Sequence, residues 1–352
     1  MTCLLTSAAQ AVTQYTITDL GSLDGSWSVA LGINASGQVV GYASTAMGYE
    51  RAFLWENGVM QDLGSLGDTR SRAAGINASG QVVGMADAAS GGHPVLWQNG
   101  VIHDLGPVGN AWGINASGQV AGWMQTASVS CHAYLWENGV MHDLGTLGGT
   151  LSRAYDINAS GQVVGWAETA TADHRAFLWG DGAIEDLGTL GGTASEALGI
   201  NISGRVVGQA QIATGEWHAF LWIDDNDNGQ SDPGEMQDLG TLGVVPHSRA
   251  LSINASAQVV GYTYSAPEDQ QQAFLWENGV IHELDSLIPS GSGWVLNYAA
   301  EINDLGQIVG YGYHNGQKRA FLLTPIPEPA TVALAVVGVA GLLRRASRRR
   351  RG

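Results

Sequence analysis

Short runs of apolar and β-branched residues recur along nearly the whole chain, and a turn signal ends each run. The phrase INASGQVVG marks the period of this pattern and occurs, unchanged or nearly so, at seven places. These copies begin at residues 33, 76, 114, 157, 200, 253 and 302. Repeats of about 20 to 50 residues are typical of solenoids, propellers and other arrays. The repetition therefore points to an architecture and not to a single catalytic signature.

Each repeat contains four short runs that read as β-strands joined by tight turns. The first two flank the A-S-G turn of the phrase. The third reads R-A-F-L-W at 51–55, and the fourth reads V-M-Q-D-L-G at 59–64. Asn57-Gly58 between them is a strong hairpin signal, because a type I′ turn needs positive φ at both central positions. Four such strands per repeat predict the blade of a β-propeller.

The two ends of the repeat region complement each other. Residues 15–21 read as a fourth strand without a third, and residues 319–324 read as a third strand without a fourth. If the N-terminal strand completes the last blade, the ring closes and no sheet edge is left exposed. We therefore expect an all-β fold, a seven-bladed β-propeller of four-stranded blades over residues 12–324, closed by the N-terminal strand. Six or eight blades stay open as alternatives, because the 53- and 49-residue spacings of the last repeats are irregular.

The third-strand motif H/R-A-F-L-W and the fourth-strand motif D-L-G-x-L-G-G resemble the repeats of the HAF-repeat extracellular proteins. The resemblance covers residues 15–324. It implies a secreted location but no mechanism, because that family has no well-defined activity.

The first eleven residues, MTCLLTSAAQA, end in Ala9-Gln10-Ala11, the small-x-small pattern of a signal-peptidase site. The apolar run before this pattern is short and lacks a positively charged start. We therefore interpret residues 1–11 as the remainder of a longer signal peptide, and the alternative is an unstructured N-terminus.

The C-terminal segment, residues 325–352, combines the motif Pro327-Glu328-Pro329, an apolar run at 330–343 and a cluster of arginines. This order resembles the PEP-CTERM sorting signal of Gram-negative bacteria. The resemblance implies recognition by an exosortase, a membrane-embedded cysteine protease, and delivery to the cell surface or an exopolysaccharide matrix. A hydrophobic helix of fourteen residues measures about 21 Å, less than the ~30 Å hydrocarbon core, so it needs its flanks to span a membrane. A plain tail anchor is the alternative.

The formal net charge is −17, although six of the fifteen basic residues stand in the final arginine cluster. Without residues 327–352, nine basic residues face 31 acidic ones. A surface this acidic repels nucleic acid, so we exclude nucleic-acid binding, and it suits a secreted protein that meets cations. The two cysteines are Cys3, in the targeting segment, and Cys131, so we expect no disulfide.

The fifth blade replaces its short E-N-G hairpin with the stretch DDNDNGQSDPGE at 224–235. It matches the calcium-loop pattern D-x-N-x-N-G-x5-E, with the sharp-turn glycine at loop position 6. Strands and not helices flank this loop, so we expect a structural Ca²⁺ site on a hairpin, and a polar loop without metal is the alternative. The predicted oxygen ligands are Asp224, Asn226, Asn228, the backbone carbonyl of Gln230, Asp232 and Glu235.

Functional residues of a repeat protein should interrupt the repeat. Just before the inner-strand isoleucine, Asp156 and Glu301 stand where the other blades carry glycine or serine. They alternate with the buried isoleucine, so we expect both carboxylates to face the central channel. Four tryptophans also depart from the repeat and are candidates for stacking on sugar rings or, alternatively, for packing between blades. They are Trp27, Trp112, Trp217 and Trp294.

Other recurrent polar residues read as structural. The D-L-G aspartates predict strand-end hydrogen bonds to a neighbouring turn. The N-A-S triplets match the glycosylation sequon but fit better as turn residues. His103, His142 and His282 occupy equivalent outer-strand positions in separate blades, too far apart to share a metal.

The sequence contains no Ser-His-Asp spacing, phosphate-binding loop, zinc signature or dinucleotide fingerprint. We therefore expect a non-catalytic protein, secreted or held at the membrane by its C-terminal segment. Its expected partners are the exosortase and either exopolysaccharide or an envelope protein. The alternative is a polysaccharide lyase or glycoside hydrolase, for which Asp156, Glu301 and His247 are the first residues to test. Fold alone does not decide between the two.

Overall fold

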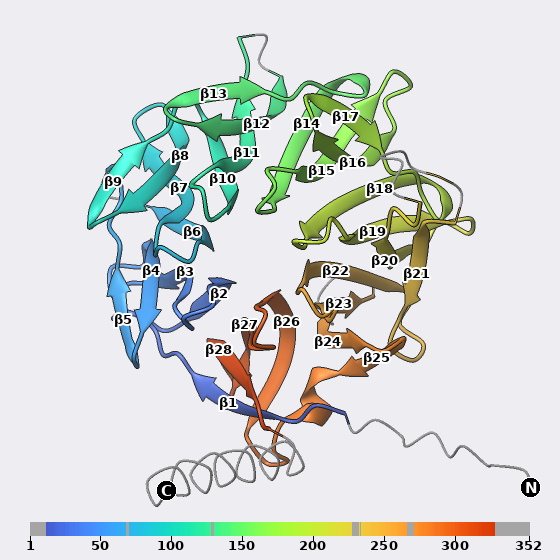
Figure 1. Ribbon diagram of the computed structural model, residues 1–352. Helices are drawn as coiled ribbons and strands as arrows, with labels where there is room; N and C mark the ends of the chain where they lie inside the picture. The colour runs from blue at the N-terminus through green and yellow to red at the C-terminus, as the bar shows by residue number, and fades with distance from the viewer. Residues whose placement is uncertain are drawn as a thin grey trace, which may run out of the picture.

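Seven four-stranded antiparallel sheets surround a central axis in the computed structural model (Figure 1). The structure describes residues 12–67, 70–127, 130–226, 232, 234–265 and 271–327. The predicted seven-bladed propeller is confirmed, and the six- and eight-bladed alternatives are wrong. We number the blades 1 to 7 in chain order of their innermost strands.

Each blade begins at the axis with a hairpin of two strands. The innermost strands are β2 (Ser28–Ile33), β6 (Ser71–Ile76), β10 (Gly109–Ile114), β14 (Gly148–Ile157), β18 (Gly191–Ile200), β22 (His247–Ile253) and β26 (Trp294–Ile302). The second strands are β3 (Val39–Ser44), β7 (Val82–Ala88), β11 (Val120–Gln125), β15 (Val163–Thr169), β19 (Val206–Ile212), β23 (Val259–Tyr264) and β27 (Ile308–His314).

The other two strands of each blade lie farther from the axis. The third strands are β4 (Glu50–Glu56), β8 (Gly91–Gln98), β12 (Cys131–Glu137), β16 (His174–Gly180), β20 (Trp217–Trp222), β24 (Gln271–Glu277) and β28 (Gln317–Pro325). The outermost strands are β5 (Val59–Asp62), β9 (Val101–Asp104), β13 (Val140–Asp143), β17 (Ala183–Asp186), β21 (Met236–Gly240), β25 (Val280–Glu283) and, in blade 7, β1 (Tyr15–Asp19).

Blade 7 is built from both ends of the described chain. β1 pairs antiparallel with β28, with Tyr15 opposite Pro325 and Asp19 opposite Phe321. The Ile326 N–H also donates to the Gln14 carbonyl at 2.7 Å, which extends the pairing beyond the strands. The predicted closure by the N-terminal strand is therefore confirmed, and Figure 1 shows β1 lying against β28.

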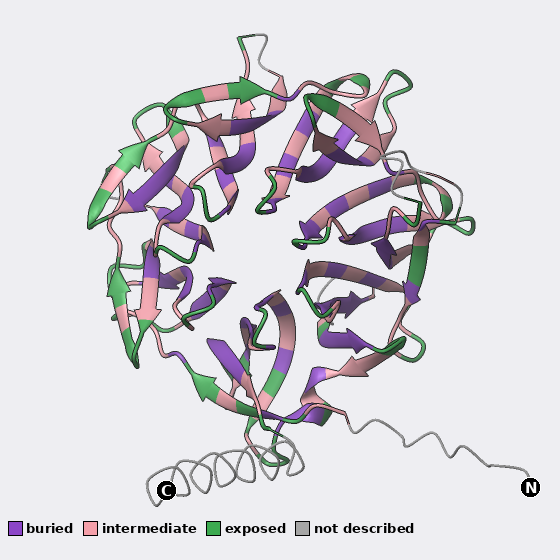
Figure 2. Ribbon diagram, in the orientation of Figure 1, coloured by how far each residue is buried: buried purple, intermediate pink, exposed green. Residues whose placement is uncertain are grey.

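The blades pack through one small and one large residue each. The inner-strand alanine of every blade is fully buried, from Ala30 in blade 1 to Ala299 in blade 7. The third strand supplies a fully buried aromatic ring in six blades, and blade 2 has Val95 there. Phe53 of blade 1 shares a core cluster with Val309 and Leu322 of blade 7, so the core runs between neighbouring sheets. Figure 2 shows the resulting gradient from buried inner strands to exposed outer strands and turns.

The asparagine of each INASGQVVG copy links one blade to the next. In Asn158, Oδ1 accepts the N–H groups of Ser160 and Gln162, and Nδ2 donates to Gln162 Oε1 at 2.7 Å. Nδ2 also donates to the backbone carbonyl of Asn201, in the next blade, at 3.3 Å. The side chain thus shapes its own turn and binds its neighbour at the same time.

These cross-blade bonds form a complete circle. Every asparagine of the seven donates to the backbone carbonyl of the next, and Asn303 of blade 7 donates to the Asn34 carbonyl of blade 1 at 3.0 Å. All seven side chains are buried. Because a buried amide left unpaired costs about 1–3 kcal/mol, each blade needs this residue at this position, which explains the repeated phrase.

Helical structure is nearly absent from the described ranges, where the only helix is the 3₁₀ turn η1 (Leu284–Leu287). No helix among these residues is long and apolar enough to cross a membrane. The predicted leader at 1–11 and the predicted hydrophobic helix at 330–343 lie outside the described residues, as do Glu328 and Pro329.

Candidate functional site

Every innermost strand contains a β-bulge three residues before its asparagine, where one residue drops out of register with the second strand. A bulge turns the side chain away from the regular pleat. All seven bulge residues line a cavity of about 250 Å³ in the central channel. They are Leu31, Ala74, Trp112, Tyr155, Leu198, Leu251 and Ala300.

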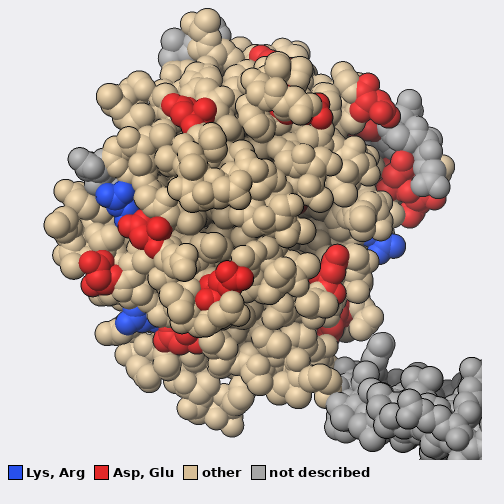
Figure 3. All heavy atoms as spheres, turned by 60° about the vertical axis from the view of Figure 1, so that its left-hand side comes forward, with Lys and Arg blue, Asp and Glu red and all other residues tan. Residues whose placement is uncertain are grey.

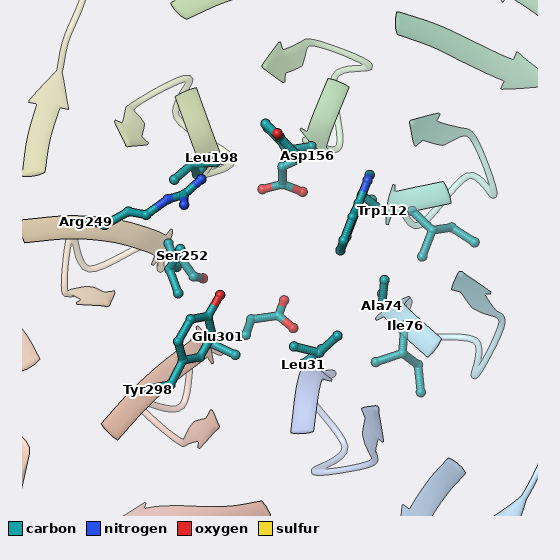
Figure 4. A pocket seen from close by; sticks show the side chains of 16 residues that line it. Leu31, Ala74, Ile76, Trp112, Asp156, Leu198, Arg249, Ser252, Tyr298 and Glu301 are labelled. Carbon is teal, nitrogen blue, oxygen red and sulfur yellow. The ribbon is translucent and has the colours of Figure 1, made fainter. Parts of the chain in front are cut away.

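Asp156 and Glu301 line the same cavity, so their predicted placement in the channel is confirmed. Figure 4 shows their carboxylates pointing toward the middle of the cavity from opposite walls. Asp156 accepts the N–H groups of Ile157 at 2.8 Å and of Ile200, in blade 5, at 2.9 Å. Glu301 Oε2 accepts the Ile33 N–H of blade 1 at 2.7 Å. Both acids therefore also tie one blade to the next.

The surroundings of these two acids favour their protonated forms. Burial raises the pKa of Asp156 to about 6, although the N–H groups of Ile200 and Ile157 act in the opposite direction. Burial, together with the negative charge of Asp156, raises the pKa of Glu301 to about 8 against the effect of the Ile33 N–H. At neutral pH the pair therefore holds one proton, on Glu301, and one negative charge, on Asp156.

Aromatic and cationic side chains surround the acids. The buried indole N–H of Trp112 has no hydrogen-bond partner in the part of the chain that the structure describes. Tyr298 stacks between Tyr262 and Tyr311, with ring centroids 4.9 and 5.1 Å apart. Arg249 donates to Glu196 Oε2 at 2.9 Å across the junction of blades 5 and 6. The cavity thus offers an apolar wall, an unused donor and a carboxyl pair.

The four candidate tryptophans have different surroundings. Trp27 lines a second cavity of about 480 Å³ between blades 7 and 1, and Trp112 lines the channel. Trp294 stacks on His314, with ring centroids 4.7 Å apart, and packs against the core, as the packing alternative predicts. The Trp217 N–H donates to His247 Nδ1 at 3.1 Å. The channel cavity is lined by neither Trp217 nor His247, so His247 does not join the two acids.

The described part of the predicted calcium loop is organised around Glu235. This buried carboxylate accepts the Asp225 N–H at 3.3 Å and the Asp232 N–H at 2.7 Å, and Asn226 Nδ2 donates to Asp232 Oδ2 at 2.8 Å. Asn228 and Gln230 lie outside the described residues. Among the residues that are described, no three His, Cys, Asp or Glu side chains are grouped to hold a metal. Calcium binding therefore stays a prediction, supported by a buried acidic side chain that holds the two ends of the loop together.

The D-L-G aspartates have the predicted structural role. In each of the six, Oδ1 accepts the N–H of the glycine two residues later, at 2.7 to 3.1 Å. Four of them also pair with a histidine, as Asp143 does with His132 at 2.8 Å. These contacts occupy the aspartates at the strand ends.

Acidic side chains dominate the face of the molecule that Figure 3 shows, and basic ones are few. Three arginines of the propeller are ion-paired with acids, Arg70 with Asp87 at 3.3 Å, Arg72 with Glu50 at 2.6 Å and Arg249 with Glu196 at 2.9 Å. This distribution agrees with the exclusion of nucleic-acid binding from the sequence.

Sequence reasoning identified the two acids but missed the bulge. The signal was present, because the residue between the invariable alanine and the following glycine changes from blade to blade, from alanine to tryptophan. A variable residue inside an otherwise repeated strand marks a side chain that leaves the packed interface.

Comparison with known proteins places one segment of the chain in a described family. Residues 325–350 match the PEP-CTERM protein-sorting motif, which confirms that resemblance at the C-terminus. The motif implies export to the cell surface or beyond through a C-terminal membrane anchor. No curated protein matches the chain in sequence.

Solved structures resemble the chain only weakly. TolB from Acinetobacter baumannii is 10% identical with a TM-score of 0.46, and the match covers 87% of this chain and 65% of that one. AofleA from Arthrobotrys oligospora is 11% identical with a TM-score of 0.44, covering 79% of this chain and 92% of that one. The Aleuria aurantia lectin, solved in complex with Fucalpha1-6GlcNAc, is 13% identical with a TM-score of 0.41, covering 79% and 98%. At these values the likeness carries no information about ligand or activity.

Proposed function

We propose that this chain is an exosortase substrate, a propeller exported to the cell surface or matrix, that binds exopolysaccharide or an envelope protein without chemical turnover. The observation that carries the proposal is the position of the sorting motif. The matched segment begins at residue 325, the last residue of β28 and the partner of Tyr15 in the closing strand pair. The sorting signal therefore follows the closed ring directly, and the propeller is the part that would be delivered.

The arrangement of the two acids supports binding over catalysis. Both oxygens of Asp156 accept backbone N–H groups, and Glu301 accepts a third. A carboxylate that holds two strands in register has a structural reason to be there. The HAF-repeat resemblance, which implies a secreted protein, stays a prediction that agrees with this proposal.

A second candidate function is a polysaccharide-acting enzyme, and one observation favours it. Asp156 and Glu301 face each other in one cavity with pKa values of about 6 and about 8, and carboxyl pairs with separated pKa values are typical of acid–base catalysis. In such an enzyme Glu301 would be the general acid. A lyase or hydrolase would create new chain ends, which a binding protein does not.

Co-sedimentation with the host's own exopolysaccharide tests both candidates. The purified full-length protein is mixed with the polymer, and protein in the pellet and new reducing or unsaturated ends are measured. Protein that pellets with intact polymer supports the binding function. New ends that disappear with Glu301→Gln support the enzyme. Protein that stays in the supernatant contradicts polysaccharide binding and leaves an envelope protein as the expected partner.

The predicted Ca²⁺ would act on the outer half of blade 5. Asp224, Asn226, Asp232 and Glu235 would hold it together with Asn228 and the carbonyl of Gln230. Bound there, the ion would fix the loop between β20 and β21 and add no chemistry to the channel. An extracellular location suits such a site, because extracellular calcium modules need only weak affinity.

A further inference from the structure

Four junctions between blades are filled from one position, five residues before the inner-strand asparagine, whereas blades 3 and 5 carry Asn110 and Glu196 there. In blade 2 this residue is Arg72, whose guanidinium lies 4.5 Å from the ring centre of Tyr42 in blade 1. In blade 4 it is Arg153, which lies 5.1 Å from the ring centre of Trp123 in blade 3. Blades 6 and 7 use Arg249 and Tyr298, which contact Glu196 and Tyr262 of the preceding blade. A long side chain thus closes each of these junctions.

The junction of blades 7 and 1 is different. Blade 1 has Val29 at this position, and its short side chain is buried. The ammonium group of Lys318, from blade 7 itself, lies over the ring of Tyr311 at 4.1 Å from its centre. A cation–aromatic contact is thus present within blade 7, and a cavity of about 480 Å³ lies between blades 7 and 1.

The seam cavity, as we call this space, carries a mixed set of side chains. Trp27 and Tyr42 form an edge-to-face pair, with ring centroids 5.8 Å apart. The other lining side chains are polar, and the whole set is Ser26, Trp27, Tyr42, Glu50, Gln317 and Lys318, with Gly316. Aromatic rings beside a few hydroxyl, amide and charged groups are typical of pockets that take a ligand with one apolar face and several hydroxyl groups.

The loop that carries Trp27 is held in place before any ligand arrives. The buried Ser44 Oγ accepts the N–H groups of Ser26 and Trp27 at 2.9 and 3.0 Å. The Gly25 N–H donates to the Ser44 carbonyl at 3.1 Å, and a Cβ at Gly25 would lie 2.3 Å from that oxygen. Glycine is therefore required there, and the backbone that carries Trp27 is held in place, which lowers the entropy cost of binding a ligand.

The charges in the seam cavity favour an anion. Glu50 is already paired with Arg72, at 2.6 Å. Lys318 makes no hydrogen bond or ion pair within the described ranges, and burial lowers the pKa of its ammonium group. An unpaired, half-buried cation is costly in water-poor surroundings, and an anionic ligand group offsets this cost.

We propose that the seam cavity binds a uronic acid residue of an acidic exopolysaccharide, with the sugar ring against Trp27 and its carboxylate at Lys318. The proposal rests on the polysaccharide-binding function proposed above and assigns it a place and a chemical class. Glu50 and Gln317 would accept and donate hydrogen bonds to the ring hydroxyl groups.

Calorimetric titration of the full-length protein in detergent micelles tests this assignment. The probes are trimers of galacturonate, guluronate and glucuronate, with α-1,4-galactotriose as the neutral counterpart of the first. We expect one of the acidic trimers to bind, Trp27→Ala to weaken it about tenfold or more, and Lys318→Gln to weaken it about tenfold. Arg205→Gln is the matched control, because it removes a cation at a position where other blades carry glutamine, and it should leave binding unchanged.

The outcomes distinguish uronic acid binding in the seam cavity from the more general proposal of polysaccharide binding. If the wild type pellets with polymer and Trp27→Ala and Lys318→Gln pellet equally well, the seam cavity is not the site, and polysaccharide binding survives. Equal binding of galacturonate and galactose trimers, unaffected by Lys318→Gln, overturns the acidic class. If no trimer binds although the polymer does, the assignment of a single-residue pocket is wrong. Failure of the wild type to pellet with any polymer overturns the wider function as well.

Discussion

The asparagine turn is the same in every blade, whereas the innermost strand before it differs from blade to blade. At the end that enters the INASGQVVG turn, all seven blades make the same asparagine bond to the next blade. Within the strand before this turn, at the positions five, three and two residues before the asparagine, no two blades carry the same three residues. Blade 1 has Val29, Leu31 and Gly32, whereas blade 4 has Arg153, Tyr155 and Asp156.

This difference separates what every blade must do from what the ring as a whole does. A bond needed by each blade is repeated seven times, because each junction loses stability without it. Side chains in the channel and seam face a single shared space, so the blades can differ there. We therefore expect substitutions in the asparagine turn to change stability. Substitutions at the variable strand positions should change binding and pH response.

The largest effect on stability is expected in the asparagine turn. Asn158→Ala removes the side chain that satisfies the Asn201 carbonyl and two N–H groups, so it should lower the free energy of unfolding by about 2–3 kcal/mol. Ser160→Ala, at an exposed position of the same turn, should change it by less than about 0.5 kcal/mol. Urea unfolding of both variants measures the difference. Equal stability of the two variants would contradict the role of the asparagine circle.

A change of similar size is expected in blade 5, where the repeat is interrupted. Calcium at about 100 times its Kd should stabilise the protein by about 2.7 kcal/mol, seen as a higher melting temperature. EDTA should reverse the shift, and Glu235→Ala should abolish it. Glu277→Ala, which removes a buried acid from the corresponding hairpin of blade 6, is the control and should keep the calcium response. A melting temperature that EDTA does not change would contradict the predicted calcium site.

A smaller effect, with a definite pH dependence, is expected in the channel. The pKa of Glu301 rises from 4.5 to about 8 on folding, so the native state binds more protons than the unfolded state between these values. Stability contributed by Glu301 is therefore present below about pH 4.5 and is lost as the pH rises toward 8. Glu301→Gln keeps an acceptor for the Ile33 N–H without the charge.

This variant should nearly match the wild type at pH 5 and exceed its stability at pH 8, by an amount that grows as the pH rises between these values. Thermal melts of both proteins at several pH values give the comparison. A constant difference across the range would mean that Glu301 does not titrate there.

The smallest effect on stability is expected at the junction of blades 1 and 2, which Arg72 fills. Arg72→Gln removes a surface ion pair to Glu50 and a cation–aromatic contact with Tyr42, together worth about 0.5–1 kcal/mol. The same substitution should widen the junction of blades 1 and 2 toward the geometry of the seam. Denaturation at low and high salt measures both parts, since salt screens the ion pair and leaves the aromatic contact. A loss of unfolding free energy larger than that of Asn158→Ala would contradict the view that the asparagine turn matters more for stability than the variable strand positions.

Much of the fold was predictable because the strands and turns of a propeller blade are encoded in short stretches of sequence. Asn57-Gly58 fixed a hairpin, the alanines marked the crowded inner strands, and the unmatched strands at 15–21 and 319–324 indicated closure. The asparagine circle was not predictable, because the acceptor of each side chain lies 38 to 53 residues away and its geometry depends on the whole ring.

The candidate sites were predictable only in part. Asp156 and Glu301 stood out because they break the repeat, and their alternation with isoleucine placed them in the channel. The seam cavity forms only where Trp27 and Tyr42 of blade 1 and Lys318 of blade 7 line one space across the closing junction, which depends on the closed ring. Calcium binding was assigned from spacing alone, and two of its ligands lie outside the described residues.

The closure of blade 7 also sets an order of events. β1 is synthesised first and has an unpaired edge until Gln317–Pro325 follows, nearly three hundred residues later. A truncated chain cannot complete the ring, because the partner of its first strand is missing. The sorting motif begins at the residue that pairs with Tyr15, so a sorting enzyme would meet it when the last strand is in place. A chain that stops before residue 325 therefore lacks both the full closing strand pair and the sorting motif.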